Sequence, residues 1–291
     1  MVINHVGEPE NKDLPFFAYG VHKPGQIAFH QIKSSLAEVP CRKLADYEMK
    51  YRDGVPVLVG EKSDENRTVG YLMKFNDQDR AYDLIGKSKT VELFKWSVID
   101  VDGIEANALV GVDIPNGCID DESSLSNYRY KRDSLFTDAL SLVGKCVKEY
   151  KGKKKINMCD FFILQMHHML LWSIIERFCI FKYGYFAIGS NKNKLAKEPV
   201  FKEELKKIGR GDIIWTSDTL EDRKLNPNNY WDSIQYYYTI RCNVVHKGKT
   251  VGDEERLKLK WALEELYEMF QAVYDDTSLK TDEEYRLYGI F

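Results

Sequence analysis

A fixed cation, an amide and an imidazole lie close together in this chain, as Arg241, Asn243 and His246. A guanidinium can hold a phosphate in a bidentate fork, and an imidazole can transfer a proton near pH 7. We therefore expect phosphodiester chemistry, with His246 as general acid or base and Arg241 stabilising the charge that builds on the phosphate. The Asn243 amide would orient His246 or the phosphate through hydrogen bonds.

Helix geometry limits how these side chains can meet. Residues 241 and 246 are five apart, which places them about 140° apart around an α-helix. We predict a helix that starts at Pro227 and ends near Val245, so that His246 folds back beside Arg241. The following Lys247-Gly248-Lys249 favours such an ending, because glycine commonly follows a helix and cations favour its last turn.

Neighbouring residues have the chemistry to bind RNA. Lys247 and Lys249 are expected to hold flanking phosphates. Of the aromatic run at 236–238, we select Tyr237 to stack on a base, while core packing is the default for the others. A purely structural role, with Arg241 and the residues after it as a helix cap, is the competing interpretation.

Composition restricts where RNA can bind. The 291 residues carry a net charge of −3, so an RNA-binding surface must be a local patch. The six cysteines form no Cys-x-x-Cys pair, which indicates reduced thiols in a cytoplasmic protein and no zinc site. The apolar residues 159–181 are interrupted by His167, Glu176 and Arg177, which favours a buried core helix over a membrane span.

The chain divides into a β-rich part and a helical part. We predict a first domain over residues 1–115, a polar linker over 116–128 and a helical domain over 129–291. Period-two apolar patterns predict strands at 16–19, 55–59, 68–75, 95–101 and 104–112, with one short helix at 78–85. Apolar spacings of three and four predict helices at 131–150, 157–183, 199–208, 227–245 and 253–274.

The helical part resembles the HEPN superfamily of small helical bundles. In that family a long helix and a polar insert precede an Arg-x4–6-His helix, often with Asn between the two residues, and Arg241, Asn243 and His246 fill these places. The Trp-Ser-Ile-Ile-Glu-Arg-Phe string at 172–178 resembles the preceding long helix. The resemblance covers roughly residues 130–275 and implies a metal-independent ribonuclease without cofactors, built as a homodimer whose two motifs face one cleft. Glu176 is a candidate partner for Arg241.

The first domain resembles the gamma-glutamylcyclotransferase-like fold over about residues 14–112. Residues 16–25 match a strand that runs into Tyr-Gly-x-x-x-Pro-Gly, and the resemblance implies a ligand pocket at Tyr19, Gly20, Val21 and His22. The glutamate that serves those enzymes as acid and base falls near Gly86 here. Without that carboxylate we expect a non-catalytic domain that senses a small molecule or a protein.

These observations predict an α+β protein, with a small mixed β-barrel-like domain followed by an all-α HEPN-like bundle. The first expectation is a homodimeric endoribonuclease that cleaves tRNA or mRNA, an architecture that suits toxins and anti-phage effectors. A non-catalytic HEPN protein that binds RNA, nucleotides or partners is the first alternative. A gamma-glutamylcyclotransferase-like enzyme with an unrecognised base is the second.

Overall fold

The computed structural model describes residues 4–52, 55–60, 67–112, 129–216, 221–247 and 252–288, without the side chains of Arg52, Ile188, Val245, His246 and Lys247. The chain forms two compact units. The first contains Met1–Asp133, Ile180–Ala187 and Ser278–Phe291, and the second contains Ser134–Cys179 and Ile188–Thr277. The predicted linker at 116–128 lies outside the described residues.

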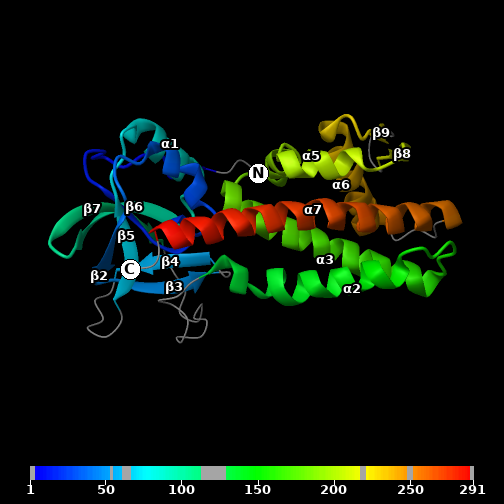
Figure 1. Ribbon diagram of the computed structural model, residues 1–291, viewed down its shortest axis with the longest axis horizontal. Helices are drawn as coiled ribbons and strands as arrows, with labels where there is room; N and C mark the ends of the chain where they lie inside the picture. The colour runs from blue at the N-terminus through cyan, green and yellow to red at the C-terminus, as the bar shows by residue number, and fades with distance from the viewer. Residues whose placement is uncertain are drawn as a thin grey trace. The chain divides into compact units, whose positions relative to one another are not determined.

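A closed five-stranded sheet forms the body of the first unit (Figure 1). Its strands follow the order β1 (Phe16–Ala18), β5 (Thr68–Met73), β2 (Cys41–Ala45), β6 (Phe94–Val101) and β7 (Ile104–Gly111). The sheet closes because β7 pairs back with β1 in parallel, where Asn107 lies opposite Phe16. The strands β4 (Val55–Val59) and β3 (Glu48–Arg52) extend the sheet beyond β7. The predicted small mixed barrel is thereby confirmed.

Aromatic packing fills the barrel. The Phe16 ring meets the rings of Phe75, Tyr82 and Trp96 at centroid distances of 6.4, 6.5 and 6.0 Å. Tyr82 is on α1 (Gln78–Lys87). Asp77 caps the start of this helix, because its carboxylate accepts a hydrogen bond from the Arg80 amide. That capping fixes the helix start and directs Tyr82 into the core. Short 3₁₀ turns follow β1 at Gly20–His22, Phe29–Gln31 and Lys33–Ser35.

The second unit is a helical bundle. Its helices are η6 (Leu135–Ala139), α2 (Leu140–Tyr150), α3 (Met158–Tyr183), α4 (Ile188–Ala196), α5 (Pro199–Lys206), α6 (Tyr230–Lys247) and α7 (Asp253–Tyr288). Phe178 on α3 packs at 5.3 Å from Phe270 on α7, and Tyr267 on α7 closes over Gly144 on α2. The helical region is as predicted, but the prediction of an all-α bundle left out one β element. A two-stranded hairpin of β8 (Asp212–Trp215) and β9 (Asp222–Leu225) precedes α6.

The end of α7 belongs to the first unit. Glu284, only 4% exposed, forms an ion pair with Lys33 at 2.7 Å, and the Arg129 guanidinium lies 4.2 Å from the Tyr285 ring. The Tyr285 side chain packs directly against Gly25, whose φ of +73° only glycine adopts readily. A single helix therefore contributes to both units, which a division of the chain into consecutive domains cannot represent.

Among the described residues, α3 is the helix with the length and hydropathy of a membrane span, and 39% of its most apolar window is buried. A single helix of this kind also occurs in the core of helical bundles. Here Leu171, Ile174 and Phe178 of α3 are fully buried within the second unit.

Candidate functional site

Arg241 of the predicted motif lies on α6 opposite Glu176 of α3. Its Nη2 atom is 3.4 Å from the Glu176 Oε1 atom, which is long for a charge-assisted hydrogen bond. Burial raises the pKa of Glu176, while the neighbouring Arg241 lowers it. The Arg241 Nε atom is buried and has no hydrogen-bond partner among the described residues. The guanidinium therefore keeps hydrogen-bonding capacity that the fold does not use.

Further unpaired polar atoms lie on the same stretch of α3. His168 is fully buried, and neither of its ring nitrogens has a hydrogen-bond partner in the described part of the chain. Burial, and secondarily the charge of Arg241, lowers the pKa of His168 to about 3, so its ring is neutral at pH 7. The indole nitrogen of Trp172, one turn further along, is also buried and unpaired. Such atoms are costly in a protein core, and their occurrence beside one arginine marks this region as unusual.

A second cation comes from α4. The Lys192 Nζ atom lies 3.5 Å from the centre of the Tyr238 ring and donates to the Gln235 Oε1 atom at 2.8 Å. Lys192 is only 4% exposed, and burial lowers its pKa to about 8. The Arg241 guanidinium carbon lies 5.7 Å from the centre of the same ring. Two cations thus gather around Tyr238, with Glu176 as the carboxylate that pairs with Arg241.

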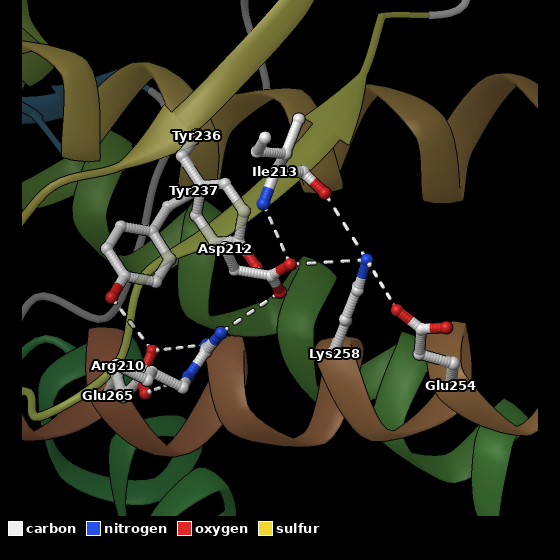
Figure 2. A network of polar contacts seen from close by, with 8 residues as sticks. All are labelled: Arg210, Asp212, Ile213, Tyr236, Tyr237, Glu254, Lys258 and Glu265. Atoms are coloured by element: carbon white, nitrogen blue, oxygen red, sulfur yellow. Dashed lines mark hydrogen bonds and ion pairs between the residues drawn. The ribbon is translucent and has the colours of Figure 1, made fainter.

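Arg210 shows the opposite arrangement, that of an arginine with a structural role (Figure 2). It donates to both carboxylate oxygens of Glu265 at 2.8 Å and to Asp212 at 3.0 Å. Tyr236 also donates to Asp212, at 2.8 Å, and Tyr237 donates to Glu265, at 2.9 Å. These bonds hold the hairpin, α6 and α7 together, and each of the three nitrogen atoms of the Arg210 guanidinium makes one of them. Among the residues that the structure describes, Arg241 has no comparable network.

The structure describes some of the other predicted site residues and leaves the rest outside its described part. Tyr237 is fully buried and bonded to Glu265, so its ring has no free face for a base, and that part of the prediction is wrong. Asn243 donates from its Nδ2 atom to the Trp215 carbonyl oxygen at 2.9 Å, while its buried Oδ1 atom has no described partner. Lys249 and the side chains of His246 and Lys247 lie outside the described residues.

The motif helix ends later than predicted. α6 extends to Lys247, so His246 lies within the helix, about 140° around its axis from Arg241, and the helix end at Val245 that was predicted to bring the two residues of one chain together is absent. Gly248 as the residue after the helix remains compatible with this boundary.

The predicted pocket residues of the first unit are all buried. The Tyr19 hydroxyl donates to the Leu109 carbonyl and accepts from the Leu58 amide, so its polar atom is used within the barrel. Gly20 has a φ of +53° and lies against the Pro56 ring, and Val21 is 4% exposed. His22 is 6% exposed, and burial, followed by the charge of Lys89, holds its pKa well below the usual value.

Gly86, near which the resemblance to the gamma-glutamylcyclotransferase-like fold would place a glutamate, has no space for a side chain. A Cβ atom there would lie 1.7 Å from the carbonyl oxygen of Gly7. The neighbouring Lys89 is 6% exposed, and burial lowers its pKa to about 7. The site therefore has neither the carboxylate nor the room for one.

Sequence reasoning missed Lys192, the strands β2 and β3, the helix α4 and the hairpin, and it did not single out His168. The spacing of Lys192 on a short charged helix carries no signal of its own, and a histidine on an apolar helix does not differ in pattern from one that packs in the core. Among the described residues, no group of three or more His, Cys, Asp or Glu side chains has a metal-binding arrangement. Comparison with protein-family models, with curated proteins and with solved structures found no match to this chain.

Proposed function

We propose that this chain is a metal-independent endoribonuclease of the HEPN type, with Arg241 and His246 as its catalytic residues. The contrast between the two arginines of the helical unit carries the proposal. Arg210 makes two bonds of 2.8 Å to Glu265, whereas among the described residues Arg241 has one carboxylate contact, at 3.4 Å, and a buried Nε atom without a hydrogen-bond partner. A guanidinium held in place but not fully bonded is suited to bind a phosphate that arrives from outside.

The proposed reaction uses the ribose 2′-hydroxyl as nucleophile, so no metal-bound water is needed. His246 accepts the 2′-hydroxyl proton as the O2′–P bond forms, and the P–O5′ bond breaks. The leaving 5′-oxygen takes a proton from the protonated His246 of the second copy in the dimer, which leaves a 2′,3′-cyclic phosphate and a 5′-hydroxyl. Arg241 stabilises the added negative charge on phosphorus oxygens, with Lys192 contributing to the local positive potential. Asn243 orients the phosphate or His246.

A homodimer is part of the proposal. Phe162 and Met166 on α3 are 54% and 66% exposed, and with Met169, Ser173 and Glu176 they repeat at spacings of four and three. Residues at these spacings lie along one helix face, as in the seam of a coiled coil. This apolar stripe leads to the Glu176–Arg241 pair. A second copy of the chain docked on the stripe would bring two Arg241 residues toward one cleft and cover the exposed apolar side chains.

The test is RNA cleavage by the purified full-length protein in EDTA, with tRNA and messenger RNA as substrates. We expect cyclic phosphate ends, and a loss of at least about 100-fold in Arg241→Ala and His246→Ala. His167→Ala is the matched control, because His167 is on α3 and bonds to its own helix through the Ile163 carbonyl. Absence of cleavage by the wild-type protein, with or without extracts that supply an activator, would contradict the proposal.

A non-catalytic binding protein is the second candidate. It is favoured by the two cations around Tyr238, which form a phosphate-binding site without any role for His246. In that case RNA binding would depend on Arg241 and Lys192, His246→Ala would bind as the wild type does, and no product would form. The first unit then senses or recruits a ligand in both candidates, since Gly86 leaves it without a general acid.

A further inference from the structure

The β8–β9 hairpin exposes an aromatic surface next to the candidate site. Ile213 pairs with Lys224 and Trp215 pairs with Asp222, and residues opposite each other on antiparallel strands share a face. On this outer face Trp215 is 60% exposed and Ile213 is 44% exposed, whereas Leu225 on the inner face is 3% exposed. A large aromatic side chain held in solvent has no role in the packing of the hairpin itself.

The hairpin is anchored firmly from its inner face. Asp212 accepts hydrogen bonds from Tyr236 at 2.8 Å, from Arg210 at 3.0 Å and from the Ile213 amide at 2.7 Å. Lys258 on α7 adds an ion pair to Asp212 at 3.2 Å and a hydrogen bond to the Ile213 carbonyl at 3.3 Å (Figure 2). An ion-paired network of this density fixes the position of the short strand, so the surface that presents Trp215 is rigid.

The same strand is bonded to the catalytic motif. Asn243, two residues after Arg241 on α6, donates to the Trp215 carbonyl oxygen at 2.9 Å. Arg223 of β9 lies on the inner face, and its charge contributes to the lowered pKa of Lys192 beside Tyr238. The backbone of Trp215 is therefore joined through one hydrogen bond to α6, the helix that carries Arg241.

We propose that Trp215 is a stacking platform for a base of single-stranded RNA whose backbone phosphate is bound at Arg241 and Lys192. The inference rests on the proposed function and names its substrate class. A base stacks on an exposed indole only when it is unpaired and turned outward, as in a loop or a single strand. Lys224, on the outer face of β9 and 3.9 Å from Asp222, adds a cation on the face that presents Trp215. Two exposed apolar side chains make a patch too small for the core of a stable protein interface, which favours RNA over a protein partner.

The experiment measures binding of a fluorescein-labelled single-stranded RNA of about 12 nucleotides to the full-length protein carrying His246→Ala, by fluorescence anisotropy. We expect Trp215→Ala to weaken binding roughly tenfold and Trp215→Phe to stay within about threefold of the parent, because any aromatic ring can stack. Trp231→Ala is the matched control, since Trp231 is 47% exposed at the start of α6 in the same unit. Binding of the same sequence as a duplex is expected to be unaffected by Trp215→Ala.

Three outcomes would each overturn the proposal. Trp215→Ala could bind single-stranded RNA as tightly as the parent, it could weaken duplex binding as much as single-strand binding, or the parent could fail to bind single-stranded RNA. A lower molecular mass of Trp215→Ala in light scattering would also overturn it, and would identify the patch as a contact between protein chains. Far-ultraviolet circular dichroism of Trp215→Phe and Trp215→Ala excludes misfolding as the cause. Cleavage assays distinguish this proposal from the proposed ribonuclease activity. If RNA binding depends on Trp215 but no RNA is cleaved, Trp215 is the stacking platform and the protein is not a ribonuclease. If RNA is cleaved, and neither cleavage nor binding depends on Trp215, the protein is a ribonuclease and Trp215 is not a stacking platform.

Discussion

The Nη2 atom of Arg241 lies 3.4 Å from the Oε1 atom of Glu176, on the neighbouring helix α3. Both side chains are partly exposed, at 25% and 33%, so the pair is accessible to a ligand. A carboxylate in this position competes with a phosphate for the same guanidinium.

Removal of that negative charge is expected to strengthen RNA binding. In Glu176→Gln, the affinity for single-stranded RNA should rise about fivefold, because one unit charge near a bound phosphate is worth about 1 kcal/mol in a solvated site. Anisotropy titrations at several salt concentrations measure the effect. The control is Glu268→Gln, a 53% exposed carboxylate on α7 that pairs with Lys151 at 3.5 Å. Weaker binding in Glu176→Gln would show that Glu176 positions Arg241 and does not compete with the ligand.

A charge on the apolar stripe of α3 is expected to dissociate the proposed dimer. Met166→Glu places a carboxylate at a 66% exposed position of the stripe, and burying it without a partner would cost several kcal/mol. Light scattering should report a monomer, and RNA cleavage should fall in parallel. Leu142→Glu, at a 50% exposed position on α2, should change neither the mass nor the activity. A wild-type monomer at all concentrations would contradict the composite site.

Substitution at Gly86 is expected to disrupt the first unit. Even Gly86→Ala places a Cβ atom 1.7 Å from the Gly7 carbonyl oxygen, so the unfolding free energy should fall on the order of 3 kcal/mol. Gly189→Ala is the matched control on a helix, because nothing lies within 4 Å of its Cβ position, and it should stabilise α4 by about 1 kcal/mol. Chemical denaturation measures both. A Gly86→Ala variant as stable as the wild type would mean that residue 7 can move away and that the position can accept a side chain.

Lys89 is expected to make the free energy of unfolding change with pH between 7 and 10.5. Burial lowers its pKa from 10.5 to about 7 in the folded state. Between these values the unfolded chain binds a proton that the folded chain does not, so the unfolding free energy falls as pH drops from 10.5 to 7. Lys89→Met should remove that slope and add up to roughly 4 kcal/mol at pH 7. Denaturation curves at intervals of pH measure it, with the exposed Lys95→Met as control. If the slope of unfolding free energy against pH is the same in Lys89→Met as in the wild type, groups other than Lys89 cause it.

Hydrophobic periodicity was enough to predict most of the secondary structure. The strands at 68–75, 95–101 and 104–112 and the helix at 157–183 each carry a long, regular apolar pattern, and each matches an element of the structure within a few residues. The hairpin at 212–225 was missed because its strands are four residues each and are stabilised by charged residues. Its stability comes in part from Lys258 and Glu265 of α7, which are distant in the sequence from the hairpin and from Arg210.

The sequence by itself determined the α+β class, four of the five barrel strands (all but β2), the helical second half and Arg241 as the residue to examine, because residue type and local spacing are sufficient for those conclusions. Only the tertiary structure decided that Arg210 is held by two carboxylates, that Tyr237 is buried while Trp215 is exposed, and that Gly86 faces the Gly7 backbone. Those facts depend on contacts between segments far apart in the chain. No local sequence pattern predicts these facts, because the free energy of a buried charge or an unpaired atom depends on the groups that the fold brings next to it.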